Sequence, residues 1–249
     1  MRRCPALHTA TGGRVLAGGD QGRRAAAVFD VLGPVYEKAF AHSEAHLASL
    51  EWLLGRLAPG SRVLDVGSGT GRPTASTLAA AGHEVLGIDV SPVMVELATR
   101  QVPDATFRRA DIAEVPLGDG SFDAVCVYFS LLQMSREQQS DLIRRLARGL
   151  RPGGSLVLAT VPADVEDVEV VFMGQPVRAT SFATEDLVSL VNRAGLAVES
   201  EHHTMFTPAH ADAVAEPHVF LYCMREETRP PARRDRSRRG GQGLPGCVG

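Results

Sequence analysis

The stretch Val63-Leu64-Asp65-Val66-Gly67-Ser68-Gly69-Thr70-Gly71 decides the fold. An apolar run of strand length leads into three alternating glycines, and a helical pattern follows at 74–81, where Gly82 ends it. Glycine lets the backbone turn sharply and lets a ligand approach main-chain atoms. The following helix begins with free N–H groups at its positive dipole end. We therefore predict a strand at 62–66, a tight loop, and a ligand site at that loop.

The glycine spacing argues against a nicotinamide dehydrogenase, which is one alternative for such a loop. Dinucleotide-binding loops place a third glycine where the helix packs closely on the strand, and Arg72 occupies that place here. Asp65, two residues before the first glycine, puts a carboxylate at the end of the strand. A carboxylate there suits a cationic group, such as an amino group, better than a pyrophosphate.

Two further acids end the next two predicted strands. Asp89 ends the strand at 84–89, and Asp111 follows the strand at 106–110. A carboxylate in the first position can accept hydrogen bonds from both ribose hydroxyls. One in the second position can accept from an adenine amino group. Ligands bind at this edge of open α/β sheets, so we expect the three acids to face one site.

Strands and helices alternate through most of the chain. Further strands are expected at 122–128, 155–160, 196–202 and 218–225, and helices at 92–100, 137–150 and 183–194. This order predicts βαβ units, a mostly parallel sheet and right-handed crossovers. The last two strands have no helix between them and should pair antiparallel. The fold class is α/β, Rossmann-like and doubly wound.

Charge is unevenly distributed along the 249 residues, whose net charge is −3. Residues 1–25 carry +4 and residues 226–249 carry +3, which leaves −10 for residues 26–225. An acidic body disfavours a nucleic-acid partner. We expect disordered tails at 1–25 and 227–249, the latter basic, around one domain at 26–226, with an N-terminal helical cap at 26–60 and a core at 61–226.

Other bulk features exclude several classes of protein. No segment reaches the length of a membrane span, no signal peptide is evident, and no cysteine pair has metal-ligand spacing. His42 and His46 share one helical face, but no third ligand accompanies them. We expect no metal, no membrane partner and a cytoplasmic location.

The ordered motifs resemble those of the class I S-adenosylmethionine (SAM)-dependent methyltransferases, in particular the small-molecule branch of ubiquinone-pathway and natural-product enzymes. The matching runs are VLDVGSGTG, GIDVS, Asp111-Ile112, FDAVCVYFSLLQM and LRPGGSLVL. The resemblance implies SAM as cofactor and a seven-stranded sheet whose last strand is antiparallel. It implies a cofactor site in which Asp89 binds the ribose. The residues around the methionine part would be Gly67, Gly69, Val127 and Tyr128, and those around adenine would be Val90, Asp111 and Ile112.

One run departs from that pattern. Many relatives carry histidine after the fourth strand, where this chain has Leu131-Leu132-Gln133-Met134. A general base therefore cannot be assigned to that place. His203 and His210, between the last two strands, are the candidates that remain.

We expect the acceptor to bind to segments that lie outside the cofactor motifs. Residues 168–181 predict a hairpin over the strand ends, and Tyr36 on the N-terminal helix is expected to close over the cofactor. The expected acceptor-binding residues are apolar: Phe129, Phe172, Met173, Phe206.

These features favour methyl transfer from SAM to an O, N or C atom of a small, partly apolar molecule, such as a secondary metabolite. Two alternatives remain open: a SAM-binding protein with a non-methylating reaction such as cyclisation, and an RNA or protein methyltransferase. The sequence does not identify the acceptor, and it leaves open whether the chain is a monomer or a homodimer.

Overall fold

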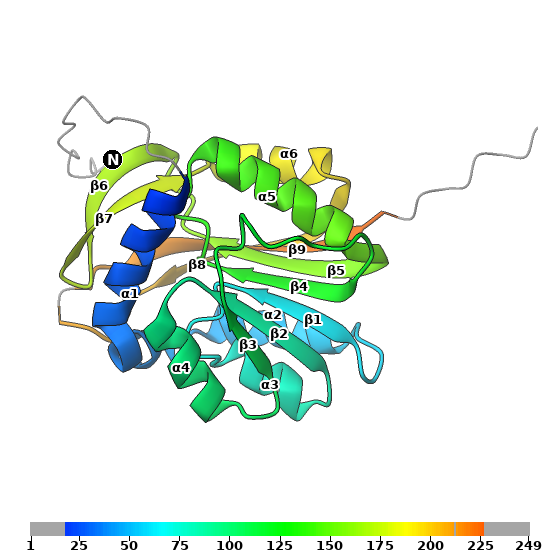
Figure 1. Ribbon diagram of the computed structural model, residues 1–249. Coiled ribbons are helices and arrows are strands. Elements are labelled where there is room, and N and C mark those ends of the chain that lie inside the picture. Colours follow the sequence, from blue (N-terminus) through cyan, green and yellow to red (C-terminus); the bar gives the residue numbers. More distant parts are fainter. Residues whose placement is uncertain (1–17, 212, 227–249) are drawn as a thin grey trace, which may run out of the picture.

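The computed structural model describes residues 18–226, except residue 212. A seven-stranded sheet lies between two layers of helices, and a two-stranded hairpin lies beside it (Figure 1). The helices are α1 (Gly18–Phe40), α2 (Glu44–Leu54), α3 (Thr74–Ala80), α4 (Pro92–Gln101), α5 (Arg136–Gly149) and α6 (Thr184–Arg193). The strands of the large sheet are β1 (Arg62–Val66), β2 (Glu84–Asp89), β3 (Thr106–Arg109), β4 (Phe122–Tyr128), β5 (Leu150–Thr160), β8 (Leu196–Phe206) and β9 (Glu216–Arg225).

The order of strands in the large sheet is β3-β2-β1-β4-β5-β9-β8. The first five are mutually parallel, and β9 runs antiparallel to both β5 and β8. The predicted fold class, a Rossmann-like doubly wound α/β sheet whose last strand is antiparallel, is confirmed. From β1 the chain adds β2 and β3 on one side of the sheet, and it then returns to place β4 on the other side of β1. The topological switch point of the sheet therefore lies between β1 and β4.

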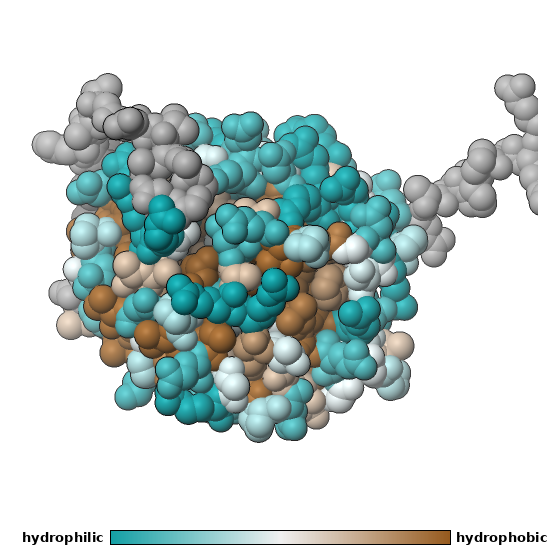
Figure 2. Space-filling model, viewed as in Figure 1, coloured by the Kyte–Doolittle hydropathy of each residue, from teal (hydrophilic) through white to brown (hydrophobic). Residues whose placement is uncertain are grey.

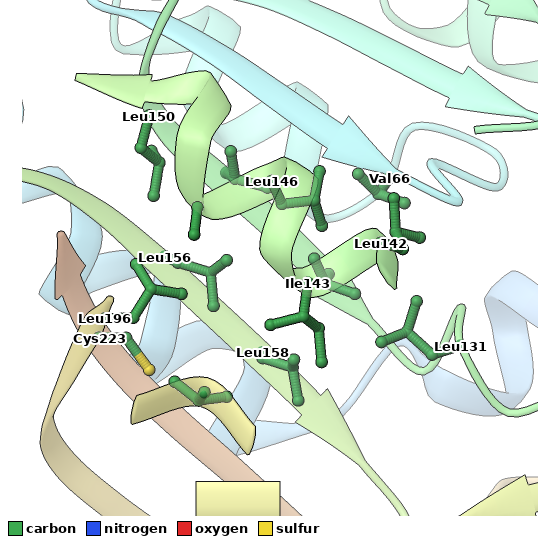
Figure 3. Packing of buried hydrophobic residues seen from close by; sticks show 14 of the residues in the cluster. Val66, Leu131, Leu142, Ile143, Leu146, Leu150, Leu156, Leu158, Leu196 and Cys223 are labelled. Carbon is green, nitrogen blue, oxygen red and sulfur yellow. The ribbon is translucent and has the colours of Figure 1, made fainter. Parts of the chain in front are cut away.

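Each face of the sheet has its own hydrophobic core. Helices α5 and α6 cover one face, while α2, α3 and α4 cover the other (Figure 1). On the first face, Leu142, Ile143 and Leu146 of α5 lie over Leu156 and Leu158 of β5 (Figure 3). The strands β4 and β5 are buried on both faces, as their nearly continuous apolar sequences predict.

Helix α4 begins as its sequence predicts. The Ser91 hydroxyl accepts a hydrogen bond from the backbone N–H of Met94 (3.0 Å), and Pro92 occupies the first turn. The start of α4 is therefore fixed directly after Asp89, at the edge of the sheet where the site lies.

The N-terminal region differs from the prediction. Helix α1 begins at Gly18, so the expectation of a disordered tail is wrong for residues 18–25. The segment lacks apolar periodicity, but Gly22 packs against the carboxylate of Asp111. Further along α1, the Ser91 hydroxyl at the start of α4 donates a hydrogen bond to Asp30 (2.5 Å), and Gln101 donates one to Glu37 (3.1 Å). Residues 1–17 and 227–249, the remainder of the expected tails, lie outside the described residues.

A break at Gly33-Pro34 divides α1. Gly33 has φ 45° and ψ −130°, a conformation that glycine adopts without penalty. The helix also exposes Val31 and Val35, which are 66% and 48% accessible. Figure 2 shows hydrophobic residues among hydrophilic ones on the face of the molecule that carries α1.

The hairpin expected at 168–181 is present and is slightly longer. Its strands are β6 (Val165–Phe172) and β7 (Gln175–Ser181), and they pair antiparallel. The backbone N–H of Thr180 donates to the carbonyl of Leu132 (2.7 Å), which ties the hairpin to the loop after β4. Figure 1 shows α1 and the hairpin together at one end of the large sheet. None of the described helices has the length and hydropathy needed to cross a membrane.

Candidate active site

A cavity of about 390 Å³ lies at the carboxyl ends of β1, β2 and β4. Its walls come from the glycine loop, from α1, from the hairpin and from the first residue of β9. This is the edge of the sheet at which the sequence predicts a site. The cavity has a polar end near Asp89 and Asp111, and hairpin valines and aromatic side chains line the remainder.

The glycine loop forms one wall of the cavity. Gly67 and Gly69 both line it, with φ values of 69° and 52°, which lie in the left-handed region that favours glycine. A Cβ atom added to Gly69 would meet nothing within 4 Å, so the space beside this residue is open. A Cβ atom added to Gly67 would lie 2.3 Å from Cβ of Ser130. Gly67 therefore allows close packing of two loops, and Gly69 leaves room for a ligand.

Asp89 connects the glycine loop to the start of α4. One carboxylate oxygen accepts a hydrogen bond from the N–H of Gly69, and the other accepts one from the N–H of Ser91, both at 2.9 Å. Burial raises the pKa of Asp89, and the hydrogen bonds from the backbone oppose this rise. Each carboxylate oxygen can accept more than one hydrogen bond, so Asp89 can still bind a hydroxyl of a ligand in the cavity.

Asp65 lies underneath the loop and is not part of the cavity wall. Its side chain is buried, and Oδ2 has no hydrogen-bond partner. Burial, with a further contribution from the charge of Asp89, raises the pKa of Asp65 from 3.8 to about 7. A cation near the loop would stabilise the ionised form.

Val90, Asp111 and Ile112 line the polar end of the cavity, as predicted from their strand positions. Asp111 accepts a hydrogen bond from the N–H of Ala113 (2.9 Å). Gly22 of α1 packs against this carboxylate, because a Cβ atom added to Gly22 would lie 2.9 Å from Oδ2 of Asp111. The first turns of α1 therefore form part of this wall, which the sequence did not indicate.

The structure separates Val127 from Tyr128. Successive side chains of a strand point to opposite faces, so Tyr128 lines the cavity while Val127 lies in the core under α5. The prediction that the Val127 side chain lies at the site is therefore wrong.

Tyr128 is held by two residues of α2. Its hydroxyl is 2.7 Å from the hydroxyl of Ser49, and its ring stacks on His46 at 3.8 Å between centroids. Burial, together with His218, lowers the pKa of His46 to about 3. His46 is therefore a packing residue near the site, and its ring is uncharged at neutral pH.

Of the residues expected to bind the acceptor, Phe129 and Phe172 line the cavity and Met173 and Phe206 do not. Met173 packs with Leu32 and Ala39 of α1. The ring of Phe206 stacks on that of Phe40, which itself lines the cavity. Tyr36 lines the cavity as predicted, and burial, followed by the charges of Glu216 and Asp89, raises its pKa well above the usual value.

Neither histidine proposed as a base lies on the cavity wall. His203 is exposed on β8, where Nε2 is 2.5 Å from Glu201. His210 follows β8 in the loop and also does not line the cavity. The structure therefore does not support these two predictions: His203 is exposed on the edge strand β8, and His210 lies in the loop that follows it.

Several residues of the wall were missed from the sequence. The hydroxyl of Ser130 is buried without a hydrogen-bond partner. Ala25, Phe29 and Phe40 come from α1, and Glu216 begins β9. Only the apolar spacing along α1 could have indicated the aromatic pair.

Comparison with known proteins identifies the class. The sequence model of the methyltransferase domain matches residues 63–154. An uncharacterised methyltransferase of Synechocystis, sll0829, is 32% identical over 152 residues, which cover 59% of this chain and 71% of that protein. The chain belongs to the class I SAM-dependent methyltransferases, and SAM is its methyl donor.

Two further relatives are informative. A demethylmenaquinone methyltransferase of Beutenbergia cavernae is 42% identical over 101 residues, which are 41% of each chain. The crystal structure of the Burkholderia thailandensis 1,6-didemethyltoxoflavin N1-methyltransferase, with its acceptor and S-adenosylhomocysteine (SAH), superposes with a TM-score of 0.65. That match covers 87% of this chain and 94% of the other at 19% identity, and it shows a shared fold.

Proposed function

We propose that this enzyme transfers the methyl group of SAM to a nucleophilic atom of a small, partly apolar molecule, a secondary metabolite. The observation that carries this proposal is that the two ends of the cavity differ in chemistry. The polar end has the carboxylates and glycines suited to SAM, and the remainder, to which α1 and the hairpin contribute, is mainly apolar. The demethylmenaquinone methyltransferase and the 1,6-didemethyltoxoflavin N1-methyltransferase to which the chain is similar support a small-molecule acceptor.

The residues of the polar end fit SAM. Oδ2 of Asp65, in the strand that leads into the glycine loop, and the hydroxyl of Ser130, which lies against Gly67, are both buried without a hydrogen-bond partner. A carboxylate can stabilise the ammonium of the methionine part, and a hydroxyl can donate to its carboxylate. The open space beside Gly69 leaves room for that part.

Asp89 would accept hydrogen bonds from the ribose hydroxyls. Val90, Asp111 and Ile112 would surround adenine beneath the first turns of α1. Tyr128, held by Ser49, would limit the position of the methionine part.

The bound cofactor supplies an electrophilic methyl group, and the protein must align the acceptor with it and exclude water. Phe129 and Phe172 provide apolar walls for the acceptor, and Tyr36 covers the middle of the cavity. Arg178 is the only Lys or Arg side chain among the described residues that line the cavity, and it pairs with Asp167. A polyanionic acceptor such as RNA would therefore find little to bind.

Two measurements test the proposal. Isothermal titration calorimetry should show micromolar binding of SAM and SAH and no binding of NADH. Transfer from tritium-labelled SAM, followed in a cell extract, should place the label in a fraction that organic solvent extracts. Label found only in tRNA or protein would refute the small-molecule acceptor. SAM binding with no labelled product in any fraction would favour a non-methylating reaction.

A further inference from the structure

Glu216 and His218 form a pair at the apolar end of the cavity. Glu216 is the first residue of β9 and lines the cavity, and its side chain is 25% exposed. His218 lies two residues further along the strand, on the same face. Its side chain is completely buried, and Nε2 is 2.8 Å from Oε1 of Glu216.

Aromatic rings hold His218 in place. The centroid of its ring is 4.4 Å from that of Phe129 and 5.5 Å from that of Phe206. An ionised carboxylate can only accept hydrogen bonds, so Nε2 carries the proton in the pair. Nδ1 is buried and has no partner among the described residues. The packed imidazole therefore has one polar contact, and this contact orients the carboxylate of Glu216 at the cavity wall.

Glu216 is placed differently from the other acids of the cavity wall. Among the described residues that line the cavity, the carboxylates are Asp89, Asp111 and Glu216. The first two follow β2 and β3, and both accept hydrogen bonds from the backbone at the polar end. Three strands, β1, β4 and β5, separate β2 from β9. Glu216 is thus the carboxylate at the end where the acceptor must lie.

We propose that Glu216 binds the nucleophilic O–H or N–H group of the acceptor and is its general base, and that His218 is the positioning residue for this carboxylate. The inference rests on the proposed function. A lone pair of the acceptor atom forms the new bond to the methyl carbon, and the electrons of the broken C–S bond remain on sulfur as a thioether. The proton of the acceptor moves to the carboxylate of Glu216 and then to water. The acceptor is therefore an apolar molecule with a hydroxyl or amine, and a group that carries no proton would gain nothing from this site.

A pair of simple probes tests the contact without knowledge of the natural acceptor. 2-Naphthol has an O–H group, and 2-methoxynaphthalene has the same rings without it. Their dissociation constants would be measured by fluorescence on protein saturated with SAH. A hydrogen bond to a charged acceptor should make the wild-type protein prefer 2-naphthol by at least about tenfold. In Glu216→Gln and His218→Phe this preference should fall to about threefold or less, with the affinity for 2-methoxynaphthalene unchanged.

The chain offers a matched control on the neighbouring strand. Glu201 and His203 form the same type of pair on β8, but both are exposed and outside the cavity. Glu201→Gln should leave the preference unchanged. Tritium transfer from labelled SAM to 2-naphthol should be slower in Glu216→Gln by about 100-fold in kcat, with an unchanged KM for SAM, and should be unaffected in Glu201→Gln.

Two results would overturn the inference: a wild-type protein with no preference for 2-naphthol, or a Glu216→Gln variant that keeps the preference or the wild-type kcat. Calorimetry with SAH separates this failure from a failure of the proposed function. A wild-type protein that does not bind SAH would contradict the methyltransferase site itself, whereas normal SAH binding in all variants would confine the failure to Glu216.

Discussion

Replacement of Gly69 by alanine tests the position of the cofactor. Gly69 has φ 52°, and a Cβ atom there would meet nothing within 4 Å of the protein. The added methyl group therefore makes no steric clash in the folded protein. The substitution should lower the free energy of unfolding by about 1–2 kcal/mol, because an L-residue at this position must adopt the left-handed backbone conformation. For a domain of this size, such a loss lowers the melting temperature by about 2–8 °C.

The affinity for SAH should fall in addition to this loss of stability. The space beside Gly69 is part of the cavity, and we propose that the methionine part of the cofactor fills it. A methyl group there would displace the ligand or force the loop to move, and either should weaken SAH binding at least about tenfold, or about 1.4 kcal/mol. Calorimetry with SAH would measure the affinity, and thermal unfolding the stability.

Gly82 provides the matched control. It has φ 84°, a Cβ atom there also meets nothing within 4 Å, and it lies in the exposed turn after α3, outside the cavity. Gly82→Ala should therefore destabilise the protein by a similar amount without a change in SAH affinity. The reasoning is refuted if Gly69→Ala binds SAH within about twofold of wild type, or if Gly82→Ala loses affinity to the same extent.

Three further variants test other parts of the site. Burial raises the pKa of Asp65 to about 7, so between about pH 4 and pH 7 the ligand-free folded protein retains a proton that the unfolded chain releases. Its free energy of unfolding should fall across this window by up to about 4 kcal/mol, and Asp65→Asn should remove this part of the fall; parallel melting curves for the two proteins from pH 4.5 to 7.5 would contradict this. Asp89→Ala should weaken SAH binding at least about tenfold and also lower the melting temperature, because two buried N–H groups lose their acceptor at about 1–3 kcal/mol each; unchanged SAH affinity in calorimetry would show that Asp89 only connects the loop to α4. Phe172→Ala should raise the KM of the acceptor, since a lost apolar contact costs about 1–3 kcal/mol, with SAH affinity within threefold of wild type; an unchanged KM would place the acceptor elsewhere.

Much of the sheet could be predicted because its signals are local. Residues 62–66, 84–89 and 122–128 are short apolar runs that turn residues or acids end, and the strands occupy these bounds. The start of α4 was also predictable, because Ser91 and Pro92 make a cap from neighbouring residues. In these segments the apolar pattern and the residues at the ends indicate the same secondary structure, so few other assignments are possible.

The beginning of α1 could not be predicted in the same way. Residues 18–25 combine glycine and arginine without apolar periodicity, a composition that favours disorder in isolation. Helix α1 packs against α4, and Gly22 packs against Asp111. The sequence of residues 18–25 gives no information about where these partners lie. Gly22, a weak helix former, is suited to its position because a side chain there would press on Asp111.

The candidate base shows most clearly what sequence alone cannot decide. The chain contains two similar pairs, Glu201 with His203 and Glu216 with His218, each with one residue between its members. The sequence alone does not distinguish the two pairs, and the prediction named His203 and His210 because both lie between the last two predicted strands. The difference arises from the order of strands: β9 lies between β5 and β8, so the start of β9 reaches the cavity while β8 is the solvent-exposed edge. A histidine that orients a carboxylate benefits from rigid packing. His218 has such an environment, because its ring packs between those of Phe129 and Phe206.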